Sequence, residues 1–235
     1  SSDVGAAFPV LIDRTAPWRP QLTAVFAAGP TLVGDRGVTA ASAVTVVGRA
    51  EPGSTVDIFD DLVKVGTVIA DARGDWSFGA SGLIDGVHRL RARATDAAGN
   101  TSVLPSITYT ITVDSTPPAA PTILAAIDGV APNEGELTSG AATNDPQPLL
   151  SGTTEAGSVV SIFDGATLLG TADVTGTAWT FRPAAALAAG IRTLTAKATD
   201  AAGNGSGASA PFVVVVDAIG ESFKGFGTLP ADGTY

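Results

Sequence analysis

A unit of about 100 residues occurs twice in this chain, and this internal repeat constrains the fold more than any other feature. The segment 51–60, EPGSTVDIFD, returns as 155–164, EAGSVVSIFD, at an offset of 104 residues. The segment 94–100, ATDAAGN, returns unchanged as 198–204, and the WSF of 76–78 is matched by the WTF of 179–181. Such a period predicts consecutive copies of one structural module.

A third, partial copy lies at the start of the chain. Residues 7–13, AFPVLID, resemble residues 210–217, which close the second repeat. We therefore expect the natural protein to be an array of modules. The predicted division is the last strand and linker of a preceding module in 1–13, a first domain in 14–113, a second domain in 114–217, and a tail or the start of a following segment in 218–235.

Each unit contains seven short segments typical of strands, separated by turn residues. Residues alternate with period two in several of them, which indicates half-buried strands. In the segment 88–95 this places Leu90, Ala92 and Ala94 in the core and the arginines between them on the outer face. Residues 184–189 could form one helical turn, and no longer helix is indicated. In the first unit the predicted strands are 21–26, 44–50, 55–60, 64–70, 76–78, 88–95 and 105–113.

The order of the repeated motifs resembles the bacterial Ig-like domains. These motifs are GxxExGS, IFD, GxxWxF (GDWSF in the first unit), TDAAGN and, after the first unit, a closing VDxTPP. The resemblance extends over about residues 6–217. Proteins with this pattern are large biofilm adhesins, usually exported by type I secretion. The resemblance implies an all-β fold of tandem seven-stranded immunoglobulin-like β-sandwiches arranged end to end, secretion to the bacterial cell surface, and calcium between domains.

Charge and composition narrow the possible partners. The formal net charge is −10, and an acidic surface repels nucleic acid, whose binding needs clustered basic residues. The chain has no cysteine, so disulfides are excluded. The longest aliphatic run, Phe212–Val216, is far too short to span a bilayer. We expect a monomer that inserts into no membrane through this segment.

The sequence offers little for catalysis. His88 is the only histidine, it lies in a predicted strand, and a structural role is expected for it. The serines lack the sequence of a nucleophile elbow, and no glycine-rich loop precedes a helix. We therefore predict that the segment is not an enzyme.

Acidic and amide residues repeat at matching positions of the two units. In an Ig-like sandwich the loop between the second and third strands and the loop between the last two lie at the pole that receives the incoming chain. Three carboxylates would meet at each pole, and Ca²⁺ accepts six to eight such oxygen ligands. The candidate calcium ligands are Asp13, Glu51, Asp96 and Asn100 at the first domain and Asp114, Glu155, Asp200 and Asn204 at the second.

A second interpretation of these residues remains open. Aspartate and asparagine also favour turns, because their side chains accept hydrogen bonds from nearby backbone amides. Under that interpretation the repeated residues shape loops and bind no metal. The pairs Asp60-Asp61, Asp85-Gly86, Asp128-Gly129 and Asp164-Gly165 are interpreted as hairpin turns at the opposite pole.

Two further motifs receive structural interpretations. Arg73-Gly74-Asp75 is the tripeptide that integrins recognise, but the second repeat has no arginine or aspartate there, so a chance occurrence in a turn is expected. Trp76 and Trp179 each precede a phenylalanine by two residues and are predicted to fill the core rather than stack on sugars.

These observations favour a structural extender, a stalk of modules that projects the adhesive part of a bacterial surface protein and is rigidified by calcium at the domain junctions. Its partners would be neighbouring modules of the same chain, with host or biofilm surfaces reached through other regions. Two alternatives remain: a module that itself binds a glycan or receptor, and an accessory domain of a secreted polysaccharide-active enzyme.

Overall fold

The computed structural model describes residues 12–217, which divide between Thr116 and Pro117 into two compact units. No helix occurs in these residues, so residues 184–189 form no helical turn, and none of the described segments is a helix that could cross a membrane. The prediction of an all-β fold is confirmed. The expected strand at 7–13 and the tail 218–235 lie largely or wholly outside the described residues.

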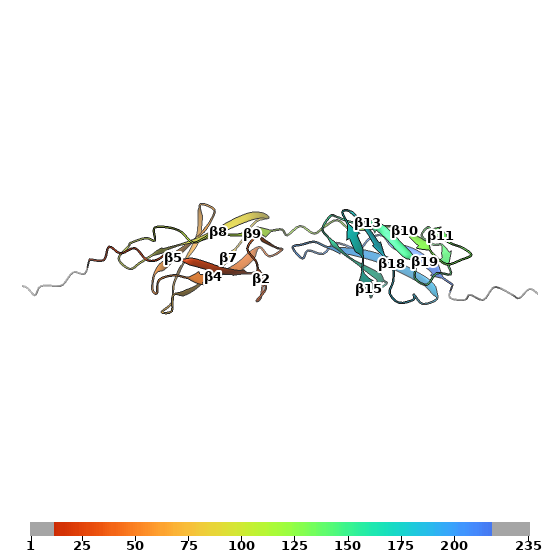
Figure 1. The fold of residues 1–235 in the computed structure, drawn as a ribbon, viewed down its shortest axis with the longest axis horizontal. Coiled ribbons are helices and arrows are strands. Elements are labelled where there is room, and N and C mark those ends of the chain that lie inside the picture. Colours follow the sequence, from red (N-terminus) through yellow and green to blue (C-terminus); the bar gives the residue numbers. More distant parts are fainter. Residues whose placement is uncertain (1–11, 218–235) are drawn as a thin grey trace, which may run out of the picture. The chain divides into compact units, whose positions relative to one another are not determined.

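The first domain is a sandwich of two mainly antiparallel sheets (Figure 1). One sheet has the strand order β2-β1-β4-β7, and the other has the order β3-β9-β8-β5-β6. The first sheet contains β1 (Gln21–Phe26), β2 (Leu32–Val33), β4 (Ala43–Arg49) and β7 (Asp75–Ser81). The second contains β3 (Gly37–Thr39), β5 (Thr55–Asp60), β6 (Val63–Ile69), β8 (Gly86–Thr95) and β9 (Tyr109–Val113).

The second domain repeats this arrangement. Its sheets have the orders β11-β10-β13-β17-β16 and β12-β19-β18-β14-β15. The first of these contains β10 (Thr122–Asp128), β11 (Gly135–Leu137), β13 (Leu149–Thr153), β16 (Asp173–Thr175) and β17 (Ala178–Phe181). The second contains β12 (Ala142–Thr143), β14 (Val159–Asp164), β15 (Thr167–Thr171), β18 (Gly190–Thr199) and β19 (Phe212–Val216).

The cores follow the predicted alternation. Leu90, Ala92 and Ala94 of β8 are completely buried, and the matching residues of β18 are buried as well. Trp76 is 4% exposed and Trp179 is 1% exposed, which confirms that they fill the two cores. Each domain has its own buried cluster, and burial of large apolar side chains is the main stabilising contribution to such a sandwich.

Two strands differ from their predicted bounds by more than two residues at one end. The strand expected at 105–113 is shortened to β9 at Tyr109–Val113, because Pro105 has no amide to donate and Ser106 instead bonds Ala92 through both its amide and its hydroxyl. The strand expected at 76–78 is longer, because β7 pairs with β4 from Asp75 to Ser81.

Candidate metal site

The loop that carries Asp96 begins where β8 ends and is shaped by the Asp96 side chain. Asp96 Oδ1 accepts hydrogen bonds from the amides of Ala98 (2.9 Å) and Asn100 (2.8 Å). Its Oδ2 accepts one from Asn100 Nδ2 at 2.9 Å. Because the carboxylate closes this turn on itself, the conformation of the loop is set by residues that lie within four positions of one another.

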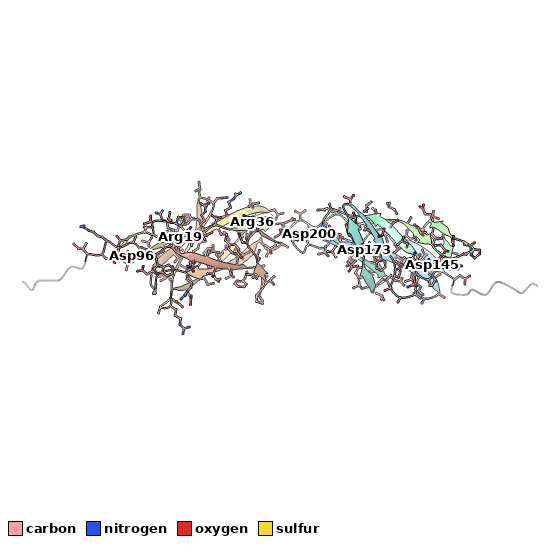
Figure 2. The ribbon with its side chains drawn as sticks, viewed as in Figure 1. Arg19, Arg36, Asp96, Asp145, Asp173 and Asp200 are labelled. Carbon is pink, nitrogen blue, oxygen red and sulfur yellow. The ribbon has the colours of Figure 1, made fainter. Side chains whose placement is uncertain are left out.

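The second domain builds the same turn. Asp200 Oδ1 accepts from the Asn204 amide at 2.8 Å, and Asp200 Oδ2 accepts from Asn204 Nδ2 at 2.9 Å. Figure 2 labels Asp96 and Asp200. In both domains the side-chain hydrogen bond from the asparagine outweighs the effect of burial and, together with backbone amides, lowers the pKa of the aspartate below its usual 3.8. Both carboxylates are therefore ionised at neutral pH.

Glu51 and Glu155 lie in the loops between β4 and β5 and between β13 and β14. The Ser54 amide and hydroxyl donate to the Glu51 carbonyl at 3.0 and 2.7 Å, and the Ser158 amide donates to the Glu155 carbonyl at 3.2 Å. The turns thus hold the glutamate backbones, while the Glu51 side chain is half-buried and that of Glu155 is exposed.

Asp13 reaches the pole of the first domain on the incoming chain. Asn100 Nδ2 donates to the Asp13 carbonyl at 3.2 Å, and the Thr15 amide donates to Asp13 Oδ1 at 2.9 Å. Asp13, Glu51 and Asp96 line one hollow together with the loop residues that follow Glu51 and Asp96. The structure therefore brings three of the four candidate ligands to one hollow and connects the fourth, Asn100, to two of them.

The donor set suits a hard cation, but the side chains are not arranged as a cage. In the described part of the chain, no group of three or more His, Cys, Asp or Glu side chains is arranged to hold a metal ion. The oxygens of Asp96 accept hydrogen bonds and retain further lone pairs. Binding would require the Asp13 and Glu51 side chains to turn toward Asp96, which their exposed or half-buried positions permit.

The other candidate ligands are divided between the units. Glu155, Asp200 and Asn204 belong to the second unit, whereas Asp114 lies at the end of the first, directly after β9. Asp114 Oδ1 accepts a hydrogen bond from the Thr116 amide at 3.1 Å, and the Asp114 amide donates to the Thr39 carbonyl at 3.0 Å. Asp114 thus lies in the segment that leaves the first domain.

The interpretation of Asp85-Gly86 as a hairpin turn is wrong, because the strands on either side, β7 and β8, belong to different sheets. Asp85 instead has a role that the sequence analysis did not identify. Its Oδ1 accepts hydrogen bonds from the Ser115 amide (2.9 Å) and hydroxyl (2.7 Å), and its Oδ2 accepts one from the Thr116 hydroxyl (3.1 Å). The Ser115 hydroxyl contributes most to a lowered pKa of Asp85. Asp85 therefore fixes the outgoing segment to the first domain. The hydroxyl residues Ser115 and Thr116 before Pro117 are the only sequence feature that could have indicated this contact.

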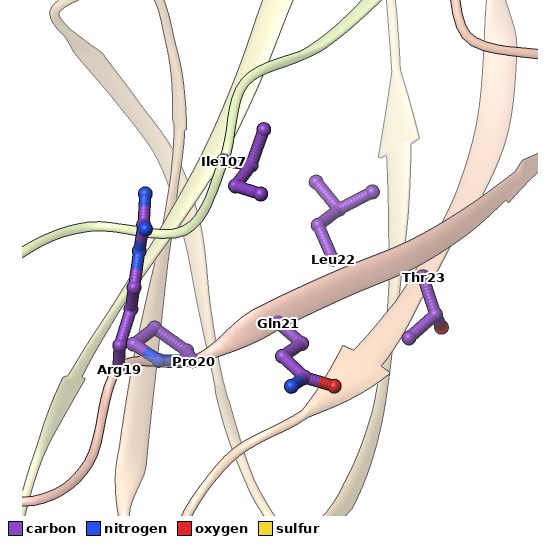
Figure 3. Close-up of a pocket in the computed structure, with 6 residues that line it drawn as sticks. All are labelled: Arg19, Pro20, Gln21, Leu22, Thr23 and Ile107. Carbon is purple, nitrogen blue, oxygen red and sulfur yellow. The ribbon is translucent and has the colours of Figure 1, made fainter.

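The incoming segment of the first domain is fixed as well. Arg19 Nε donates to the Pro105 carbonyl at 2.6 Å. Figure 3 shows Arg19 and Ile107 in the hollow beside the start of β1, which is lined by residues 19–23 and Ile107. These residues include no carboxylate and no nucleophile that would suggest chemistry.

Three other acidic residues have structural partners. Asp75 of the Arg-Gly-Asp tripeptide lies 2.9 Å from Arg49 Nε, and Arg49 also donates to the Arg73 carbonyl, so the hairpin uses these groups internally. In the second domain, Asp128 is 1% exposed and accepts from the Thr143 hydroxyl at 2.7 Å. Asp145, 3% exposed, accepts from the Gly129 amide at 3.0 Å. These contacts join the segment between β12 and β13 to the turn after β10, and the corresponding segment of the first domain, residues 40–42, contains no acidic residue.

A family model described as bacterial Ig-like domain matches residues 33–115 and, in a second copy, residues 125–218. The comparison with curated proteins found no match.

Among solved structures, the fibronectin(III)-like modules of Clostridium thermocellum CbhA are 15% identical over 82% of this chain and 93% of theirs, with a TM-score of 0.46. A Ca²⁺-stabilized adhesin of an Antarctic bacterium that binds ice is 22% identical over 87% of this chain and 50% of that protein, with a TM-score of 0.46. The BSP domain of a biofilm associated protein is 21% identical over 77% of this chain and 29% of that one, with a TM-score of 0.31.

Proposed function

Because the chain belongs to the bacterial Ig-like domain family, we propose that its two domains are extender modules of a bacterial surface adhesin, supporting cell adhesion or biofilm formation. The observation that carries this proposal is the fixing of both chain segments of the first domain. Asn100 and Arg19 hold the incoming segment, and Asp85 holds the outgoing one. A stalk needs such restraints, because a flexible linker between modules would let the array fold back.

Calcium is the second part of the proposal. Asp13, Glu51, Asp96 and Asn100 would supply its ligands at the first domain, with backbone carbonyls near Ala97 completing the shell. Asp114, Glu155, Asp200 and Asn204 would do the same at the second. A divalent cation would neutralise carboxylates whose repulsion otherwise destabilises the pole, and it would hold the linker aspartate against the domain.

The expected affinity is that of extracellular calcium modules. With a dissociation constant on the order of 0.1 mM, calcium at about 1 mM would add roughly 1.4 kcal/mol of stability per site. A secreted or surface-exposed location supplies calcium at such concentrations. We propose that the segment is monomeric there and is not an enzyme.

Calorimetric titration of calcium into the tandem tests the ligand assignment. A turn needs hydrogen-bond acceptors but no charge, whereas calcium needs the charge. In Asp200→Asn the remaining side-chain oxygen still accepts from the Asn204 amide, although the hydrogen bond from Asn204 Nδ2 is lost. Asp200→Asn and Glu155→Gln should each weaken binding at one site, and the double variant should be less than additive because both act on one ion. Asp173→Asn, at an exposed position of β16, is the matched control. Calcium affinity unchanged in both variants would refute the assignment.

A further inference from the structure

His88 lies at the end of the first core and is held on both sides of its ring. Its side chain is 8% exposed, Nδ1 lies 2.6 Å from Asp60 Oδ2, and Nε2 lies 2.8 Å from the Ile84 carbonyl oxygen. Asp60 is fixed in turn, because its Oδ1 accepts a hydrogen bond from the Arg89 amide at 2.9 Å.

The two partners of the ring are both acceptors. A carboxylate oxygen and a carbonyl oxygen can each receive a hydrogen bond from an imidazole N–H, but neutral histidine has only one N–H. Only the doubly protonated imidazolium makes both bonds. In either neutral tautomer one ring nitrogen turns its lone pair toward an oxygen, so one of the two bonds is lost.

The second domain has a permanent cation at this position. Strand β5 aligns Asp60 with Leu90, and strand β14 aligns Asp164 with Leu194, so His88 and Arg192 lie two residues before equivalent leucines. Arg192 Nη1 lies 3.3 Å from Asp164 Oδ2, and Arg192 Nη2 donates to the Ala189 carbonyl at 2.9 Å. Both side chains thus join an aspartate at the strand end to a carbonyl of the preceding loop.

We propose that His88 is a proton-dependent latch, which fixes the loop before β8 when the ring is protonated and releases it when the ring is neutral. The released loop includes Asp85, the residue next to Ile84, whose carboxylate holds Ser115 and Thr116 of the outgoing segment. Protonation of one histidine thereby sets how firmly the linker is attached to the first domain. In the second domain the arginine keeps the equivalent contact at all pH values at which proteins fold.

The surrounding charges favour the protonated ring. Asp60 at the end of β5 and Asp61 in the following turn place negative charge near the ring. Asp61 Oδ1 also lies 3.6 Å from Nη1 of Arg89, which follows His88 on β8. Opposite it on β9 is Ile111, and segment 39–44, which holds the same loop through Ser42, contains no titratable residue. Burial lowers the pKa of His88, but the hydrogen bonds to Asp60 and Ile84 and the two nearby negative charges outweigh it and raise the pKa above 6.5.

The direction of the pH dependence follows from this sign. A group whose pKa is higher in the folded state stabilises the fold below its unfolded pKa, and this stabilisation disappears as the pH rises through the folded value. The first domain should therefore lose stability from about pH 6.5 upward, whereas the second domain should not.

Because His88 is the only histidine, its ring nitrogen NMR signals can be followed through a pH titration of the full chain without ambiguity. We expect a pKa above 6.5 and, at low pH, two protonated ring nitrogens. A pKa at or below the ordinary value would overturn the latch, and this measurement needs no variant.

Amide exchange tests the connection to the linker. The protection factor of the Ser115 amide should fall in the wild type as the pH rises from about 6 to about 8.5, and it should stay constant in His88→Arg, which copies the second domain. Arg192→His should introduce a pH dependence into the exchange of the Thr193 amide, which donates to Asp164 Oδ1. An equal fall of Ser115 protection in wild type and His88→Arg would overturn the proposed link.

Discussion

Gly152 lies against the indole of Trp179 and the carbonyl oxygen of Thr122, so closely that a methyl group on Gly152 would overlap both. Gly48 and Trp76 form the same contact in the first domain. Each glycine pairs with its tryptophan across neighbouring strands, and the indole occupies the space in which a side chain at the glycine position would lie. The core of both domains depends on this pairing of the largest and smallest residues.

Gly152→Ala should therefore destabilise the second domain by about 1–3 kcal/mol, because the added methyl group overpacks the core. Gly48→Ala should do the same in the first domain. Chemical denaturation measures both effects. Gly79→Ala is the control, since a Cβ there meets nothing within 4 Å. Equal stability of Gly48→Ala and Gly79→Ala would contradict the overlap of a Cβ at position 48 with the indole of Trp76 and the Gln21 carbonyl oxygen.

The two tryptophans should differ in their polar contributions. Trp179 Nε1 donates to the Thr153 carbonyl at 3.1 Å, whereas Trp76 Nε1 is buried without a partner. Replacement by alanine should cost about 3–5 kcal/mol at either position. Replacement by phenylalanine should cost about 1 kcal/mol more at 179 than at 76, because only the former loses a hydrogen bond. An unchanged melting temperature in either alanine variant would contradict the core role.

In each domain a buried serine is hydrogen-bonded to the long strand β8 or β18. Ser209 Oγ accepts from the Ala196 amide at 3.0 Å and donates to the Ala210 carbonyl at 2.8 Å, and Ser106 makes the equivalent bonds in the first domain. Ser209→Ala should reduce the free energy of unfolding by about 1–3 kcal/mol, because the buried Ala196 amide loses the hydroxyl oxygen that accepts its hydrogen bond. The exposed Ser77→Ala should be neutral in the same denaturation assay.

Acid should destabilise both domains through the repeated aspartates. Asp96 and Asp200 have pKa values lowered mainly by Asn100 and Asn204, so their stabilising effect is complete above the unfolded pKa near 3.8 and is lost as the pH falls through the folded values. Asp200→Asn should reduce the acid sensitivity of the second domain below about pH 4. Thermal unfolding at a series of pH values measures this; an identical acid slope in the variant would contradict it.

The sequence predicted the fold well where residues alternate over long strands. Leu90, Ala92 and Ala94 identified the inner face of β8, and the repeat transferred this assignment to β18. The short strands β2, β3, β11 and β12 were not predicted, because two or three residues carry no visible alternation. Two of them, β3 and β12, pair in parallel with the last strand of their domain, a contact that local sequence does not encode.

The candidate site was only partly predictable. The repeat identified Asp96 and Asn100, and the order of strands placed Asp13 and Glu51 near them. The sequence could not reveal that Asp96 closes its own turn, because one residue pattern serves both turns and cation binding. The correspondence of His88 and Arg192 was missed because the residues differ, although the offset of 104 residues relates them.

Small-angle X-ray scattering of the tandem, with about 1 mM calcium or with a chelator, tests the proposed function most directly. If calcium stiffens the chain between modules, the maximum dimension should increase when calcium is added, and the increase should be absent from the Glu155→Gln, Asp200→Asn double variant. Superimposable scattering curves of the wild type with and without calcium would contradict a calcium-stiffened extender.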